Sequence, residues 1–272
     1  MLTMFKRLAS LVPTPASSKV TLFVSDTGIP SYKDDAGLVT PMSGQPIPAG
    51  YIDGLKMEYV APGQMRFTSG SAYIPSLGRA LALPSALTKT LTLSANAWYH
   101  NFLYSNSGVA DVETVTTLPD TPYSGTARTK TGDTSRRYIG SFRTDASGAI
   151  YKFRQTGNQI TYLVSTELTP FAVFSGTVPV SPATTSVSAS AIVPLTSTSA
   201  LMMNLNASTN AFLLITNSEG PAVPGFIVFV APNSTMAMTA PLAADQSMIC
   251  SYQSSGTSLT AVLRVYGYTY ER

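Results

Sequence analysis

The sequence lacks most of the side chains from which catalytic and metal sites are built. Its 272 residues contain one cysteine, Cys250, and one histidine, His100. This excludes a disulfide within the chain, a cysteine-based metal cluster and a paired-histidine zinc motif. A Ser-His-Asp or Cys-His site would depend on His100 alone. Because His100 lies in the strand-like run AWYHNFLY, we interpret it as a histidine on or under a strand face.

Charge is also scarce. Asp, Glu, Lys and Arg make up 11% of the residues, against about 25% in an average soluble domain. The mean hydropathy is slightly positive, at +0.15. A lone subunit with this balance is prone to association, whereas the subunits of an obligate oligomer bury such surface against one another. The composition therefore favours a homo-oligomer.

The basic residues are concentrated in one segment. Seven of the 17 Lys and Arg residues lie between Thr126 and Gly157: Arg128, Lys130, Arg136, Arg137, Arg143, Lys152 and Arg154. In the run RRYIGSFR, strand alternation mixes basic and apolar residues on both faces. Nucleic-acid binding needs continuous rows of basic residues, and residues 166–272 hold only two. We therefore expect no nucleic-acid partner.

No segment has the length of a membrane span. The longest apolar stretch is Phe226–Ala231, whereas a spanning helix needs about 20 residues. Residues 1–18 hold a short apolar run that Pro13 and Pro15 interrupt, unlike a signal peptide. We therefore expect no membrane insertion and no export signal.

Short strands separated by turn residues dominate the pattern. Runs such as LKMEYV, QMRFTSG and KTLTLS alternate apolar with polar residues, and turn signals such as APG and SLG separate the strand-like runs. This spacing is typical of a sandwich or a barrel. The one expected helix is Met1–Leu11, whose apolar residues would form a single face.

We predict an all-β chain in three parts. Residues 1–46 form an N-terminal segment with a small hairpin that has little core of its own. Residues 47–168 form a β-rich domain, and residues 169–272 form a C-terminal β-sandwich. The two larger units are sandwich-like or barrel-like.

Motifs for known chemistries are missing or incomplete. Neither phosphate-loop pattern, GxxxxGK[ST] or GxGxxG, occurs. Ser25–Gly28 contains one Asp-Thr-Gly triplet where aspartic proteases need two carboxylates, and we interpret it as a turn. Asp34 and Asp35 are too few for an oxygen-ligand metal cage. The 14 acidic residues leave a two-carboxylate glycosidase site open. We assign no catalytic, cofactor-binding or metal-binding residue and expect no cofactor.

One part of the sequence is similar to a known family. The stretch PYSGTARTKTGDTSRRYIGS, preceded by WYHNFLY and followed by GAIYKF, resembles a module of fibre and other virion proteins of tailed bacteriophages. The run GLKMEYVAPGQMRFTSGSAYIPSLGRALALPSALT is similar to that family's preceding strands. PASSKVTLFVSDTGIPSYKDDAGLVTPM is similar to the small unit that often opens such fibres. Together they cover about residues 13–160, and residues 170–272 lie outside the resemblance.

The resemblance implies a structural protein of the virion, made in the host cytoplasm, whose copies intertwine in a homotrimer, and no enzyme activity. It makes residues 1–46 the virion-attachment segment, residues 47–168 the fibre or shoulder domain and residues 169–272 the head. We expect a tail fibre or receptor-binding protein that is attached by its N-terminus to other virion proteins. Met1–Val12 would dock on the particle, and the C-terminal domain would contact a host-surface glycan or protein. A head fibre or capsid decoration protein is the alternative, and a host-polysaccharide depolymerase is a less favoured third.

Candidate contact residues are the C-terminal tyrosines, because exposed tyrosines often supply stacking and interface energy. They are Tyr252, Tyr266, Tyr268 and Tyr270. The run VYGYTY also alternates with period two, which places three tyrosines on one face as a cross-strand aromatic row. We favour this second, structural interpretation.

Overall fold

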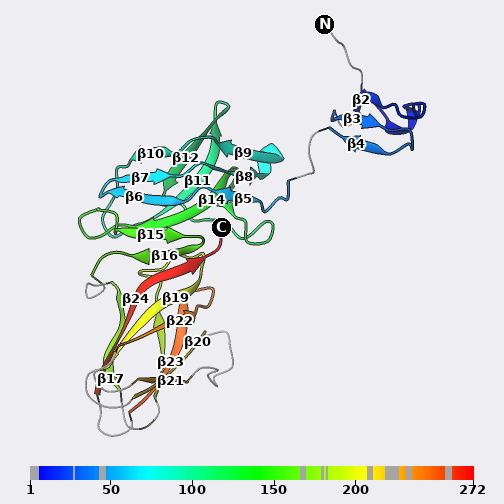
Figure 1. Cartoon of the computed structure of the whole chain (residues 1–272). Coiled ribbons are helices and arrows are strands. Elements are labelled where there is room, and N and C mark those ends of the chain that lie inside the picture. Colours follow the sequence, from blue (N-terminus) through cyan, green and yellow to red (C-terminus); the bar gives the residue numbers. More distant parts are fainter. Residues whose placement is uncertain are drawn as a thin grey trace. The chain divides into compact units, whose positions relative to one another are not determined.

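The structure is a computed structural model of the chain (Figure 1). It describes residues 6–26, 28–42, 47–165, 170–178, 181, 183–206, 211–217, 227–230, 235–254 and 259–272. The chain divides into two compact units, an N-terminal unit over Met1–Pro48 and a body over Ala49–Arg272.

The N-terminal unit is a four-stranded sheet in the order β1-β2-β3-β4. Its elements are β1 (Lys6–Arg7), a 3-10 helix (Ala9–Leu11), β2 (Thr21–Ser25), β3 (Pro30–Lys33) and β4 (Val39–Pro41). β1 runs parallel to β2, and the other pairs are antiparallel. Among its described residues, only Val12 and Phe23 are buried apolar side chains. The core is therefore small, as a unit of this length leads one to expect.

The helix predicted over Met1–Leu11 is wrong where the structure describes it. Lys6–Arg7 form a strand, and only Ala9–Leu11 form a single 3-10 turn. Leu8 and Leu11 remain exposed, so the expected apolar face has no packing surface in the described part of this unit. A helix this short is not stable without one. Residues 1–5 lie outside the described residues.

The first part of the body holds three sheets, in the orders β5-β8-β9, β10-β7-β6 and β12-β11-β14-β13. The elements are β5 (Ile52–Gly54), β6 (Met57–Ala61), β7 (Gln64–Phe67), β8 (Gly70–Ile74), a 3-10 helix (Pro75–Leu77), β9 (Arg79–Leu83), β10 (Leu87–Thr90), β11 (Trp98–Asn106), β12 (Val109–Val115), β13 (Thr129–Lys130) and β14 (Asp133–Arg143). In β7, Met65 and Phe67 are buried while Arg66 is exposed, the alternation expected of a half-buried strand. In β14, all residues from Arg137 to Phe142 are buried, so both faces of that strand are covered.

The second part of the body is a sandwich of two sheets. One has the order β15-β16-β24-β19-β22, with β17 also paired to β24, and the other has the order β18-β23-β20-β21. The strands are β15 (Phe153–Thr156), β16 (Gln159–Tyr162), β17 (Ala172–Val178), β18 (Ala183–Ser188), β19 (Ser197–Asn206), β20 (Ala211–Asn217), β21 (Ile227–Val230), β22 (Thr235–Pro241), β23 (Ser247–Ser254) and β24 (Leu259–Tyr270). Val187 and Met248 of one sheet share a buried cluster with Met202 and Leu263 of the other. The facing apolar sides therefore form the sandwich core.

The predicted all-β class is confirmed. The sheets are antiparallel apart from the β1–β2 pair. No α-helix occurs in the ranges that the structure describes.

Strands from both sides of residue 168 share one sheet. β16 pairs with β24 in the register Ile160↔Tyr268. Gly267 makes this pairing possible, because a β-carbon there would lie 2.3 Å from the Ile160 carbonyl oxygen. The buried cluster is likewise continuous from Leu55 to Tyr270.

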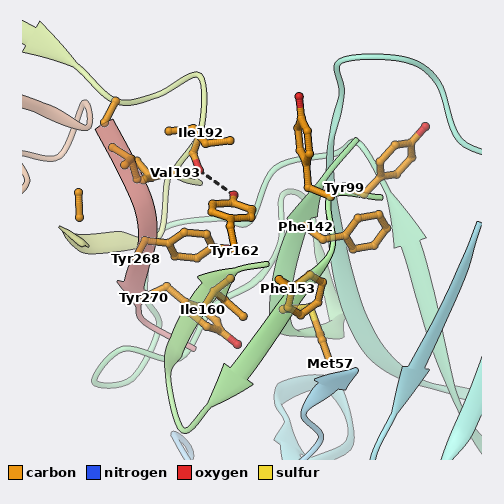
Figure 2. Close-up of a cluster of buried hydrophobic side chains, with 14 of the residues drawn as sticks. Met57, Tyr99, Phe142, Phe153, Ile160, Tyr162, Ile192, Val193, Tyr268 and Tyr270 are labelled. Atoms are coloured by element: carbon orange, nitrogen blue, oxygen red, sulfur yellow. Dashed lines mark hydrogen bonds between the residues drawn. The ribbon is translucent and has the colours of Figure 1, made fainter. Parts of the chain in front are cut away.

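Aromatic side chains fill the junction between the two parts of the body (Figure 2). Tyr162 packs edge-on against Phe171 with ring centroids 5.0 Å apart, and lies 6.0 Å from Tyr268. The Tyr162 hydroxyl donates to the Ile192 carbonyl oxygen at 2.8 Å, drawn as the dashed line in Figure 2. Each buried ring thus adds apolar area, and the Tyr162 hydroxyl finds an acceptor.

Candidate functional site

Three of the seven cations of the basic segment are paired with acids of the same chain. Glu113 of β12 accepts hydrogen bonds from Lys130 Nζ at 3.0 Å and Arg136 Nε at 3.2 Å. Arg128 Nη2 lies 3.6 Å from a Glu271 carboxylate oxygen. These cations are therefore bound to acids of the same chain and present little free charge.

Arg137 is fully buried, at 0% exposure. Its Nη1 donates to the carbonyl oxygens of Tyr138 at 2.7 Å and Arg128 at 3.3 Å. Burial lowers the pKa of Arg137 from its ordinary value. The guanidinium therefore ties backbone segments together, as its planar fork allows.

Lys152 and Arg154 are the two exposed cations of the segment. They alternate with the buried Phe153 at the start of β15. Two cations on one short strand do not make the long basic row that nucleic-acid binding requires.

A groove of about 450 Å³ lies beside the Glu113 ion pairs, where β10 meets β11 and β12. We call it the Tyr104 groove, and it is lined by Thr88, Lys89, Thr90, Leu91, Tyr104, Val112, Glu113 and Thr114. It combines an aromatic ring, hydroxyl groups and ion-paired side chains in one concave surface.

Short contacts fix the polar groups of the Tyr104 groove. Lys89 Nζ lies 2.6 Å from Asp111 Oδ1 and also donates to the Val112 carbonyl oxygen at 2.6 Å. The Tyr104 hydroxyl donates to Asp111 Oδ2 at 3.2 Å. The Arg136 guanidinium lies 4.0 Å from the Tyr104 ring centroid. Burial and the charge of Asp111 raise the pKa of Tyr104, so the phenol stays protonated.

Asp111 and Glu113 form a carboxylate pair on β12. Residues two apart on a strand point to the same face at roughly 7 Å, a spacing compatible with a glycosidase pair. However, burial acts to raise the pKa of Asp111, and hydrogen bonds from Lys89 and the Val112 amide outweigh it, so the pKa is lowered. A general acid needs the opposite shift. Asp111 therefore serves as a hydrogen-bond acceptor and not as a proton donor near neutral pH.

His100 and Ser141 lie together in the geometry of a base and a nucleophile. His100 Nδ1 is 2.7 Å from Ser141 Oγ. Both residues are buried, at 1% exposure each, and burial lowers the pKa of His100 to about 4. Nε2 of His100 has no hydrogen-bond partner in the described part of the chain, so no acid orients the ring there. The interpretation of His100 as a histidine under a strand face is confirmed.

The same network continues through Tyr138. Its hydroxyl shares hydrogen bonds with Ser141 Oγ at 2.8 Å and Thr196 Oγ1 at 2.9 Å. Burial raises the pKa of Tyr138 to about 12. This chain of neutral polar groups joins β14 to the sandwich, and all of its members are buried.

Two of the four C-terminal tyrosines are core residues. Tyr268 and Tyr270 are 1% exposed, with ring centroids 5.9 Å apart, so an aromatic row is confirmed for these two and a contact role for them is wrong. Tyr266 is only partly buried, because a bulge opposite Leu201 shifts the alternation along β24. The side chain of Tyr252 lies outside the described residues.

A second pocket, of about 320 Å³, lies near the end of β24. Its lining includes Arg128, Thr196, Ser197, Leu242 and Glu271. Arg128 Nε and Ser197 Oγ are buried there without a hydrogen-bond partner among the described residues. Both atoms lie below the accessible surface, which suits a small buried water better than a larger ligand.

Metal and membrane features were also sought. Within the described ranges, no group of three or more His, Cys, Asp or Glu residues could hold a metal ion. No helix in those ranges is long and apolar enough to cross a bilayer.

Comparisons with known proteins give no family. No family model matches the chain, and no curated protein matches it. Among solved structures, it has 10% identity to a GH32 beta-fructofuranosidase, BmSUC1, from Bombyx mori. That alignment covers 94% of this chain and 62% of the other, with a TM-score of 0.20. The chain thus spans less than two thirds of that protein, and so low a TM-score supports no argument about fold or activity.

Proposed function

We propose that this chain is a structural virion protein of a tailed bacteriophage. It is a homotrimeric tail fibre or receptor-binding protein without enzyme activity. The N-terminal unit attaches it to other virion proteins, and the C-terminal β domain contacts a glycan or protein of the host surface. The resemblance over residues 13–160 and the low charge of the chain support this proposal.

The observation that supports attachment best is the surface of the N-terminal unit. It exposes eight large apolar side chains and buries only Val12 and Phe23 among its described residues. The exposed ones are Leu8, Leu11, Val20, Leu22, Ile29, Leu38, Met42 and Ile47. In the described part of the much longer body, seven are exposed to a similar degree. An apolar surface of this density suits burial against a protein partner.

The N-terminal unit also has a hollow that suits contact with a protein partner. Its volume is about 420 Å³, and it is lined by Arg7, Leu8, Leu11 and Asp26. Two exposed leucines flanked by one cation and one anion offer both apolar contact and charge pairing, the usual makeup of a protein interface.

Attachment is tested with charge substitutions at exposed positions. Leu11 and Leu38 are 67% and 64% exposed, so Leu11→Asp and Leu38→Asp leave the core intact. Both should strongly reduce the number of copies in purified particles, measured by quantitative immunoblot. Val109→Asp on the body, at 70% exposure, is the matched control and should incorporate normally. Normal incorporation of all three variants would reject attachment through this unit.

The site of attachment separates tail fibre from head fibre. A gold-labelled antibody against residues 169–272 should label the tail of intact particles in electron micrographs. Label on the capsid shell would support the alternative, a head fibre or capsid decoration protein. Release of reducing sugar from purified host polysaccharide by the recombinant chain would instead support a depolymerase.

A further inference from the structure

We propose that the Tyr104 groove binds a neutral saccharide. This inference rests on the proposed function, because it assigns a ligand class to the host-surface contact. It adds a contact site on the first part of the body, outside the C-terminal domain.

The charges of the groove and its supporting network favour a neutral ligand. The cations are Lys89, Lys130 and Arg136, and the anions are Asp111, Glu113 and Asp133. They cancel, so neither an anionic nor a cationic ligand gains a net attraction. Hydroxyl groups can donate to the carboxylates and accept from the cations, and a sugar ring offers several at fixed spacing.

The charged groups of this network are fixed in position by their partners and are still accessible to solvent. Side-chain exposures are 27% for Lys89, 23% for Asp111, 26% for Glu113 and 25% for Arg136. Each is fixed by contacts of about 3 Å and still meets solvent. Because these partners hold them in place, little side-chain freedom is lost when a ligand binds.

The groove also has the apolar element that a sugar needs. Tyr104 and Leu91 both line it, and the Arg136 guanidinium lies over the Tyr104 ring at 4.0 Å from its centroid. Aromatic rings pack against apolar surface while the polar groups around them bond hydroxyls. Thr88 and Thr90 are exposed at the rim. The volume of about 450 Å³ lies in the range of small-ligand sites.

The test uses an array of immobilised neutral hexose and N-acetylhexosamine oligosaccharides, with sialylated and sulfated oligosaccharides as the charged set. The full chain is applied as wild type and as two groove variants. Thr88→Arg fills the groove from an exposed strand position, and Tyr104→Leu removes the ring. Thr156→Arg on β15 and Tyr32→Leu on β3 are matched controls, because neither residue lines the groove. Circular dichroism and thermal unfolding check that each variant folds.

Wild type and both controls should bind a neutral oligosaccharide, and Thr88→Arg and Tyr104→Leu should lose at least about tenfold in affinity. Equal binding by folded groove variants would overturn the proposal, as would binding to the charged set alone or to no oligosaccharide. If one groove variant does not fold, the affinity of the other variant still tests the proposal.

Failure of the proposed function is recognised separately. Subunit number and incorporation into particles are measured on the wild-type chain and on Thr88→Arg, and neither depends on the groove. A wild-type chain that forms a trimer, enters particles and binds no sugar would reject only the saccharide site. A monomer that binds neutral sugar through the groove would reject only the proposed function as a trimeric fibre.

Discussion

The Tyr268 hydroxyl donates a hydrogen bond to the Ser141 carbonyl oxygen across 3.0 Å. The two residues are 127 positions apart in the chain and lie on β24 and β14. The bond joins the sheet of the first part of the body to the sandwich, in a region from which water is excluded. Neighbouring rings of Tyr162 and Trp98 pack against Tyr268.

Tyr268→Phe should therefore destabilise the body. The ring would still fill its space, but the buried Ser141 carbonyl would lose its donor, at a cost of about 1–3 kcal/mol. Denaturant unfolding measures the change. Tyr266→Phe on the same strand, where the side chain is only partly buried, should change the unfolding free energy by less than about 0.5 kcal/mol. Equal effects of the two substitutions would argue against the Tyr268 bond.

Gly267→Ala should open the β16–β24 pairing. The added β-carbon would lie 2.3 Å from the Ile160 carbonyl oxygen, and a backbone atom cannot move aside cheaply. We expect a loss of about 2 kcal/mol or more in unfolding free energy. At Gly63 the nearest atom would be 3.7 Å away, so Gly63→Ala is the control and should have little effect. A Gly267→Ala protein as stable as wild type would show that this strand pair is not closely packed.

The sequence predicted the local structure of the body better than its long-range contacts. Alternation and turn residues located the short strands, and the surroundings of His100 indicated burial. The burial of both faces of β14 from Arg137 to Phe142 could not be predicted, because alternation distinguishes the two faces of a strand and does not show which layers cover them. The bulge beside Tyr266 could not be predicted either, because it arises from pairing with a strand about 65 residues away in the chain.

The candidate site shows the same limit. The basic segment was evident in the sequence, but its partner Glu113 comes from another strand. Lys89 comes from a third strand and completes the groove through Asp111. No spacing rule connects these residues, because the register of the sheet and the packing of β10 against it bring them together.

Acid should destabilise the fold through His100. Its pKa is about 4 in the folded chain and 6.5 as its ordinary value. Between these values the unfolded chain binds the extra proton, so the unfolding free energy falls as the pH drops through 6.5 toward 4. The full effect is about 3 kcal/mol. His100→Gln removes this titration, and subtracting its unfolding free energy from that of wild type at each pH isolates it. A difference that stays constant from pH 7 to pH 4 would contradict a neutral buried His100.

Ser197→Ala and Thr196→Val should differ in their effect on stability, although the two residues are adjacent and buried. Ser197 Oγ has no hydrogen-bond partner in the part of the chain that the structure describes, so its removal should leave stability unchanged or slightly raised. Thr196 Oγ1 bonds the Tyr138 hydroxyl at 2.9 Å, and Thr196→Val should cost about 1–2 kcal/mol. Thermal unfolding of both variants compares them. A large loss in Ser197→Ala would indicate that an ordered water or a ligand bonds that oxygen.

Sedimentation equilibrium of the purified full chain tests the central claim most directly. A chain with 11% charged residues and an N-terminal unit whose apolar side chains lie exposed should associate with its own copies. The account predicts a single species of three times the chain mass of 28.7 kDa, unchanged on dilution. A stable, well-dispersed species of 28.7 kDa at high protein concentration would contradict it.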